Sequence, residues 1–298
     1  MSGPTALLTG ATGFIGAALT RRLLADGWQV HVVLRPASSR AALPADGALH
    51  VHVHDGSSAG LRAIVGAARP DVVFHLASLF LAQHGPDDTE RLIESNVLFS
   101  TQLAEAMVAA GAHRLLNTGT SWQHYQDGDY DPVCLYAATK QAFEAILRYY
   151  TTCTPLRSVT LKLFDTYGPG DPRPKLMHLL QKTAHSGAHL AMSPGEQLID
   201  LVYIDDVVDA FVAAAGRLLS GAGAASEAFG VSSGRPLPLR ELAATFARVS
   251  GLPLDIEWGG RPYRPREVMQ PWTRYSTLPG WQPRVTLEDG LARLLGST

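Results

Sequence analysis

Cysteine, long apolar runs and clusters of basic residues are all scarce in this sequence. The 298 residues include two cysteines, Cys134 and Cys153, too few for a disulfide framework or a metal cluster, and this fits a reducing compartment. No stretch approaches the ~20 apolar residues that cross a bilayer, and no export signal precedes the first strand-like run. We therefore expect a cytoplasmic protein without a membrane span.

Charged residues are also few. They make up 17% of the chain, and the formal net charge is −2 without runs of Lys or Arg. Nucleic acids and anionic membranes attract proteins with a basic patch, so we expect neither as a partner. Average domains contain roughly 25% charged residues. The lower content here indicates that part of the surface is buried between subunits, so we expect an oligomer.

Short β-branched runs alternate with longer helical patterns in the first half of the chain. Examples are TALLT, FIGAALTRRLLADG, WQVHVVL and DVVFHLA, followed by a long helical pattern near 88–111. Such alternation is typical of βαβ units, whose right-handed crossovers place helices on both faces of a parallel sheet. The predicted fold class is α/β, a Rossmann-type doubly wound parallel sheet.

The pattern loosens after residue 165, where turns rich in Gly and Pro separate shorter elements. We therefore predict that residues 1–165 form a dinucleotide-binding domain and that residues 166–298 mostly form a small C-terminal substrate-binding lobe. Within the second part, residues 200–220 have a helical pattern that we expect to return to the first domain.

The first junction between a strand and a helix reads TGATGFIG, which places Gly10, Gly13 and Gly16 three residues apart. Glycines at this place allow a tight turn and close approach of the backbone to a pyrophosphate, and the helix N-terminus attracts its charge. The motif follows a predicted strand and begins a βαβ unit, so we predict dinucleotide binding. The same loop adds three candidate cofactor-binding residues, Thr12, Phe14 and Ile15.

The end of the second strand usually distinguishes the two nicotinamide cofactors. A carboxylate there accepts a hydrogen bond from the ribose 2′-hydroxyl, but this chain has Arg35, followed by Ser38, Ser39 and Arg40. These donors favour NADP(H), although NAD stays possible, and a solvated loop arginine is the alternative interpretation.

The third predicted strand ends at Asp55 and Gly56, where a carboxylate would lie near the adenine amino group. His50, His52 and His54 alternate just before it and share one strand face. No acidic or cysteine partner lies nearby in sequence, so we interpret them as part of the sheet and expect no metal site.

Tyr136 and Lys140 stand four residues apart in LYAATK, a spacing that puts both side chains on one helix face. A free tyrosine has a pKa near ~10, and a fixed ammonium lowers it by stabilising the phenolate. The pair could exchange a proton with a carbonyl or an alcohol. The same spacing also arises by chance in many helices.

Eight segments extend this reading along the whole chain: TGATGFIG, DVVFHLAS, ESNVLFST, NTGTSW, LYAATK, LFDTYGPG, LVYIDDVVDAF and RPREV. In this order and spacing they resemble the extended short-chain dehydrogenase/reductase family, particularly its nucleotide-sugar epimerases and reductases. The tracts GTSWQHY and LYAATKQAFE are similar to those of reductases that make CDP-linked dideoxyhexoses.

The resemblance implies roles for the central residues. Tyr136 would be the catalytic acid–base, and Lys140 would hold the nicotinamide ribose while lowering the tyrosine pKa. Thr120 would supply the third catalytic group, with Ser121 as the adjacent alternative and a substrate-binding candidate, and Thr118 is interpreted as structural.

The resemblance also implies binding residues and an assembly. Arg264 in RPREV would clasp the diphosphate of a nucleoside-diphosphate sugar, with Arg173 and Lys175 as further candidates. Leu76, Ala77 and Ser78 would line the cofactor, and Asn96 resembles a packing and water-relay position. The family commonly pairs two helices of each subunit in a four-helix bundle, so we expect a homodimer.

Several positions depart from the family pattern. Asp165 replaces an asparagine, Ile199 lies where an arginine is common, and the stretch from Thr120 to Tyr136 is short. Dehydratases of the family carry Asp-Glu directly after the active-site threonine, where this chain has Ser121 and Trp122. The absence of both carboxylates argues against a dehydratase.

The expected function is the NADPH-dependent reduction of a 4-keto (deoxy)sugar nucleotide to the 4-hydroxy sugar. One alternative is an NAD-dependent sugar-nucleotide 4-epimerase, against which Arg35 argues. Others are a reductase of a non-nucleotide carbonyl compound and a non-catalytic NADP sensor, which would have no need of Thr120, Tyr136 and Lys140.

Overall fold

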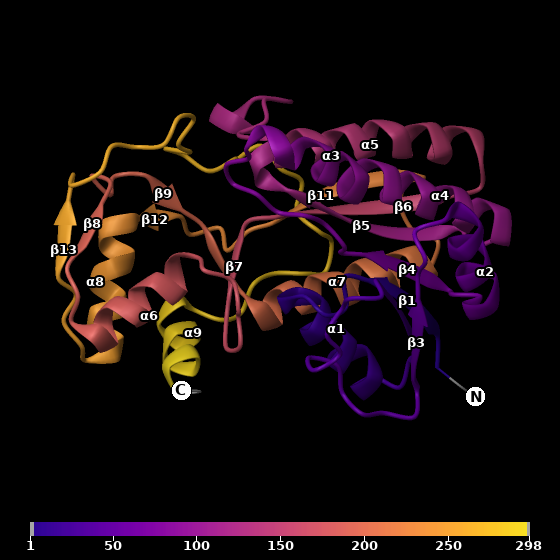
Figure 1. Ribbon diagram of the computed structural model, residues 1–298, viewed down its shortest axis with the longest axis horizontal. Helices are drawn as coiled ribbons and strands as arrows, with labels where there is room; N and C mark the ends of the chain where they lie inside the picture. Colours follow the sequence, from indigo (N-terminus) through magenta and orange to yellow (C-terminus); the bar gives the residue numbers. More distant parts are fainter. Residues whose placement is uncertain (1–2, 297–298) are drawn as a thin grey trace.

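A seven-stranded parallel sheet forms the centre of the protein, of which the computed structural model describes residues 3–296 (Figure 1). This confirms the predicted Rossmann-type fold. In spatial order the strands are β3 (Leu49–Val53), β2 (Gln29–Leu34), β1 (Thr5–Thr9), β4 (Val72–His75), β5 (Arg114–Thr120), β6 (Arg157–Leu163) and β11 (Ser226–Val231). The order reverses between β1 and β4, and at such a switch point the loops diverge and leave a crevice at the carboxyl ends of the strands.

Helices cover both faces of the sheet (Figure 1). One face carries α1 (Phe14–Ala25) and α7 (Ile204–Leu219), and the other carries α2 (Ser58–Ala68), α4 (Phe99–Ala110) and α5 (Leu135–Cys153). The strands alternate between the two cores, since Leu8 packs with α1 and α7 while Leu7 packs with the other three helices. Within residues 3–296, no helix has both the length and the apolar character to span a membrane.

The helical pattern near 88–111 forms a run of four segments rather than one regular helix. A short 3₁₀ turn (Pro86–Asp88) and α3 (Thr89–Ile93) lead into a π-helical turn, η2 (Glu94–Leu98), which continues as α4. A π turn widens the helix locally and often marks a functional position. Here it contains the buried Asn96.

The remaining elements form a smaller lobe beside the carboxyl ends of the strands (Figure 1). Its segments pair in three two-stranded sheets: β7 (Asp165–Tyr167) with β10 (Leu201–Tyr203), β9 (Leu198–Ile199) with β12 (Leu237–Pro238), and β8 (Leu190–Met192) with β13 (Ile256–Trp258). Its helices are α6 (Leu176–Ser186), α8 (Leu239–Ser250) and α9 (Leu287–Leu295).

Two elements of residues 166–298 belong to the large sheet. Helix α7 covers it, and β11 adds an edge strand that the sequence interpretation did not single out. Strand β11 is hard to predict from the sequence because its buried part is only the short run Phe229, Gly230 and Val231.

Residues 259–286, here called the strap, run from the lobe back to the sheet without forming a helix or a strand of the two-stranded sheets. Asp127 binds the strap midway, because its carboxylate accepts hydrogen bonds from the backbone N–H of Thr273 at 2.7 Å and from the Thr273 hydroxyl at 2.8 Å. Buried Asp206 of α7 accepts from the backbone N–H groups of Arg284 and Val285, each at 3.0 Å. The strap is therefore attached to the large domain through Asp127 and Asp206, and the Gly230 N–H of β11 adds a hydrogen bond to the Ser276 carbonyl at 3.0 Å.

The alternating histidines lie on the sheet, as interpreted. His50 and His52 lie on β3 beside His31 of β2, with His31 Nδ1 and His52 Nε2 2.8 Å apart, while His54 follows the strand. Burial and the neighbouring imidazoles lower the pKa of His31 to about 4. In the part of the chain that the structure describes, no group of three His, Cys, Asp or Glu side chains is placed to hold a metal ion.

Candidate active site

The glycine loop between β1 and α1 lets backbone segments approach one another closely. Gly10 has φ +76°, and a Cβ on it would lie 2.6 Å from the backbone nitrogen of Ala77. A Cβ on Gly16 would lie 2.1 Å from the carbonyl oxygen of Gly10, so helix and loop touch only because no side chain intervenes. Gly13 caps α1 without a side-chain hydrogen bond, which leaves the N–H groups of the first turn available to a phosphate. These features fit a dinucleotide.

A groove of about 230 Å³ begins at this loop and crosses the carboxyl ends of the strands. Most of the predicted site residues line it, namely Gly10, Gly13, Phe14, Ile15, Gly16, Leu76, Ser78, Thr120, Ser121, Tyr136, Lys140, Arg173 and Lys175. The groove meets a larger cavity, of about 650 Å³, between the large domain and the lobe. Arg264 lines only the larger cavity.

The three predicted catalytic residues come together from two elements. Thr120 ends β5, while Tyr136 and Lys140 lie in the first turns of α5. The Thr120 hydroxyl accepts a hydrogen bond from the Trp122 backbone N–H at 3.3 Å, which leaves its own proton free to donate. Thr118 also lines the groove, and its buried hydroxyl has no hydrogen-bond partner within residues 3–296.

Burial dominates the ionisation of Tyr136 and Lys140. It raises the pKa of Tyr136 above the ordinary value, and a hydrogen bond with Ser78 opposes this only in part. The Lys140 ammonium lies 5.9 Å from the centre of the tyrosine ring. The expected lowering of the tyrosine pKa by Lys140 is therefore absent from this structure, because desolvation of a phenolate outweighs a cation at that distance. Burial lowers the pKa of Lys140 itself to about 8.

Asn96 connects the cofactor side of the groove to α5. Its side-chain oxygen accepts from the Leu79 backbone N–H at 2.8 Å and from the Ser78 hydroxyl at 3.1 Å. Its amide nitrogen donates to the Leu79 carbonyl at 3.0 Å and to the Thr139 hydroxyl at 2.9 Å. All its polar capacity is used inside the protein, which agrees with the packing role and explains why the π turn is retained.

The residues proposed for the adenosine half lie outside the groove, at the ends of β2 and β3. Arg35 follows β2 directly, is exposed, and has no ion-pair partner in the described chain. The Asp55 carboxylate accepts hydrogen bonds from the backbone N–H and the hydroxyl of Ser57, both at 2.8 Å, and the backbone bond lowers its pKa. Ser39, Arg40 and Gly56 complete this set. Thr12 of the glycine loop and Ala77 after β4 also lie outside the groove lining, and contact of these five residues with a cofactor stays a prediction.

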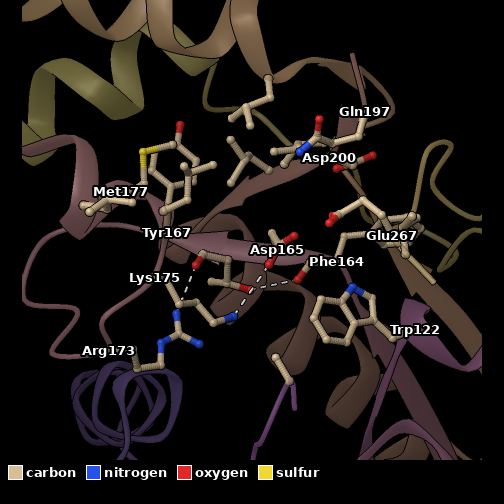
Figure 2. A pocket seen from close by; sticks show the side chains of 18 of the residues that line it. Trp122, Phe164, Asp165, Tyr167, Arg173, Lys175, Met177, Gln197, Asp200 and Glu267 are labelled. Carbon is tan, nitrogen blue, oxygen red and sulfur yellow. Dashed lines mark hydrogen bonds and ion pairs between the residues drawn. The ribbon is translucent and has the colours of Figure 1, made fainter. Parts of the chain in front are cut away.

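Each predicted cation of the larger cavity is paired with a carboxylate. Arg264 makes two bonds to Glu267, at 3.0 and 2.9 Å, and its guanidinium lies 6.0 Å from the Trp122 ring centre. Lys175 lies 3.6 Å from Asp165, so the carboxylate that replaces the family asparagine faces a cation (Figure 2).

Arg173 makes two 2.6 Å bonds to Asp171 and donates to the Thr166 carbonyl. Its guanidinium lies 4.8 Å from the ring centre of Phe14, at the start of α1. Arg173 therefore connects the lobe to the glycine loop. The side of its guanidinium that carries Nε and Nη2 already donates to Asp171. Ile199, at the position where the family commonly has an arginine, lines the cavity with an apolar side chain.

Three aromatic residues that the sequence interpretation left without a role form the junction of groove and cavity: Phe80, Trp122 and Phe164. Phe80 packs edge-to-face on Tyr136, with ring centres 4.9 Å apart, and lies 5.7 Å from Trp122. Figure 2 shows Trp122 and Phe164 on the same side of the cavity. Trp122 directly follows Ser121 and Phe80 stands two residues after Ser78, and this nearness to predicted site residues is a signal that could have identified both.

Comparisons with known proteins agree with this geometry. The profile of the NAD dependent epimerase/dehydratase family matches residues 6–224. A UDP-glucose 4-epimerase of Mycolicibacterium smegmatis is 32% identical, with 96% of each chain covered, and a CDP-abequose synthase of Yersinia pseudotuberculosis is 25% identical over 91% of this chain and 93% of its own. The crystal structure of a UDP-glucose 4-epimerase with UDP-glucose, from Thermotoga maritima, superimposes with a TM-score of 0.86 at 23% identity and covers 98% of this chain and 97% of its own.

The contact between Gly16 and Gly10 gives a test of the groove. We expect Gly16→Ala to weaken nicotinamide-nucleotide binding about tenfold or more, since overpacking costs about 1–3 kcal/mol. Gly66→Ala on α2 is the matched control, because a Cβ there has nothing within 4 Å and should leave binding unchanged. Fluorescence titration with NADPH and NADH measures both. Equal affinities in the two variants would show that the nucleotide does not use this loop.

Proposed function

The chain belongs to the NAD dependent epimerase/dehydratase family, and on that premise we propose that it is an NADPH-dependent reductase of a 4-keto sugar nucleotide. That it is a nucleotide-sugar-modifying enzyme with a nicotinamide cofactor follows from the family and its relatives. One observation carries the proposal of carbonyl chemistry: Thr120, Tyr136 and Lys140 line the groove where it opens into the larger cavity.

The chain's own residues would bind the cofactor along the groove. The glycine loop and the first turn of α1 would receive the pyrophosphate, Lys140 the nicotinamide ribose, and Arg35 a 2′-phosphate. When bound, the cofactor supplies the hydride that reduces the ketone carbon.

Tyr136 and Thr120 would act on the ketone oxygen. Tyr136 donates its phenolic proton to the oxygen as negative charge develops there, and the raised pKa keeps this proton in place until it is needed. Thr120 donates a second hydrogen bond with the proton that the structure leaves free. Lys140 then stabilises the phenolate through its positive charge. Arg264, held by Glu267, would orient the diphosphate from the strap.

An NAD-dependent 4-epimerase is the second candidate, and the 32% identical epimerase favours it. The two activities differ in the fate of the cofactor. A reductase exchanges its nucleotide in every turnover and consumes NADPH stoichiometrically with the ketosugar. An epimerase retains its nucleotide and interconverts two 4-hydroxy sugars without net consumption. Mass spectrometry of the nucleotide retained on purification, together with an NADPH consumption assay, separates them, and retained NAD with epimerisation would contradict the reductase.

Removal of the Tyr136 hydroxyl tests the catalytic assignment. We expect Tyr136→Phe to lower turnover by at least ~10² while cofactor binding is kept, because only the proton transfer is lost. Tyr149→Phe, on the same helix but 63% exposed, is the control and should keep wild-type turnover. Steady-state kinetics with a 4-keto sugar nucleotide measure both, and unchanged turnover in Tyr136→Phe would end the assignment.

The charge of Arg35 tests the cofactor assignment. Arg35→Asp would replace attraction of a 2′-phosphate by repulsion and shift the preference from NADPH toward NADH, by a few kcal/mol at most at this exposed site. Arg62→Asp on α2 makes the same charge change at another exposed position and should leave the preference unchanged. The ratio of kcat/KM for the two cofactors is the measurement. A wild-type preference for NADH would contradict the role of Arg35.

A homodimer is proposed from the apolar surface of the helices on one face of the sheet. Ile93, Leu98 and Tyr149 are 43%, 51% and 63% exposed, and the small Ala142 and Ala145 of α5 are not among its buried residues. We expect light scattering to report twice the mass of one chain and Leu98→Glu to halve it. Val53→Glu, at an equally exposed residue of edge strand β3, is the control and should stay dimeric. A monomeric wild type would contradict the proposal.

A further inference from the structure

Beneath the catalytic residues lie buried charges for which the proposed reaction has no use. Lys162 of β6 is 5% exposed, and its ammonium lies 3.2 Å from a carboxylate oxygen of Glu144 on α5. Lys162 stands in register beside Gly119 of β5, and a Cβ on Gly119 would lie 3.0 Å from the Lys162 side chain and 3.1 Å from the Glu144 carboxylate. The absent side chain at Gly119 is what allows these charges to meet under the active site.

Both carboxylate oxygens of Glu144 are held. Lys162 contacts Oε2, and the side-chain nitrogen of the fully buried Gln123 donates to Oε1 at 2.8 Å. On its other side, the Gln123 oxygen accepts from the Thr120 backbone N–H at 3.0 Å. The Glu144 carboxylate is therefore fixed in position by an ammonium and an amide, and it is partly shielded from water.

His124 is the other polar neighbour of the Lys162 ammonium. His124 Nε2 lies 2.8 Å from the Lys162 ammonium, while His124 Nδ1 lies 2.9 Å from the Gly128 carbonyl oxygen. Burial and the charge of Lys162 lower the pKa of His124, so its imidazole accepts from the ammonium and donates to the carbonyl. The Lys162 ammonium thus lies between the Glu144 carboxylate and an imidazole that accepts from it.

Glu144 also stands one helical turn after Lys140, on the same face of α5. We infer that Glu144 is a counter-ion shared by Lys140 and Lys162, and that the three charges together determine the pH at which Lys140 loses its proton. Glu144 and Lys162 are then positioning residues that act through Lys140. This inference rests on the role proposed above for Lys140 in holding the cofactor.

Glu144 and Lys162 have opposite effects on the pKa of Lys140. A carboxylate near a buried ammonium favours its charged form, and Glu144 opposes the burial that lowers the pKa of Lys140 to about 8. Lys162 acts in the opposite direction, because it offsets part of the Glu144 charge. The other groups that face Lys140 are Tyr136 on its own helix and His75 of β4, whose pKa burial lowers to about 3, so both are neutral at the pH of interest.

The test is the pH dependence of NADPH binding, followed by fluorescence without any sugar substrate. Glu144→Gln removes the anion, so Lys140 should lose its proton more easily and affinity should decline at a pH lower by roughly one unit. Lys162→Met removes the competing cation and should move the same decline to higher pH. Lys162→Arg keeps the charge and should behave as the wild type.

A purely structural role predicts a different result. Loss of packing would lower affinity at every pH, or shift both variants in one direction, and either outcome would overturn the inference. The double variant Glu144→Gln/Lys162→Met removes both charges together and should give an intermediate midpoint. It also supplies the comparison if one single variant does not fold. Thermal unfolding and circular dichroism establish which variants are folded.

Two further measurements separate this inference from the proposed function. In Lys140→Ala the alkaline decline of NADPH affinity should vanish, and a decline that persists at the same pH would mean that another group titrates, which overturns the inference. A wild type with the expected titrations but no reduction of any 4-keto sugar nucleotide would instead refute the proposed reductase and leave the inference in place.

Discussion

The hydroxyl groups proposed for catalysis come from two elements, and the hydrogen bonds of buried Gln123 hold those elements together. Gln123 bonds the end of β5 through the Thr120 N–H, and it bonds α5 through Gln141 at 2.7 Å and Glu144 at 2.8 Å. A shift of β5 against α5 would move Thr120 away from Tyr136, and small displacements of reacting groups reduce rates strongly. The groove, the aromatic junction and the buried charges all lie around this connection.

Charge around the larger cavity is arranged in pairs. Arg173, Lys175 and Arg264 each contact a carboxylate on the same or an adjacent segment. Such pairing restricts the rotamers of long side chains before a ligand arrives, and it lowers the net positive charge that an empty cavity would carry. The proposed diphosphate would therefore meet donors that are already oriented, and it would compete with Asp165 and Glu267 for them. In a cavity lined by unpaired cations, a ligand would have no such competition from carboxylates.

The sequence predicted the parts of the site that depend on local chemistry. The glycine loop, the four-residue spacing of Tyr136 and Lys140, and the alternation of strands and helices each have a cause within a few residues, and the structure contains all three. The pair of Lys162 and Glu144 joins a strand to a helix 18 residues earlier in the chain, and no local pattern indicates it. The sequence also did not predict the raised pKa of Tyr136, because burial is a property of the whole fold. Strand β11 was missed because three buried residues make too short a pattern.

The strap has a consequence for how such an enzyme diversifies. Hydrogen bonds to Asp127 and Asp206 attach it to the large domain. The strap itself contains no part of the glycine loop or of α5. Substitutions in the strap and in β9 would therefore change the wall of the larger cavity without altering the glycine loop or α5, whereas Asp165, Thr166, Arg173 and Lys175 line both the cavity and the groove. Ile199, in place of an arginine, is one change of that kind. A change of substrate would then be least coupled to catalysis at cavity positions outside residues 165–175 and outside the groove lining.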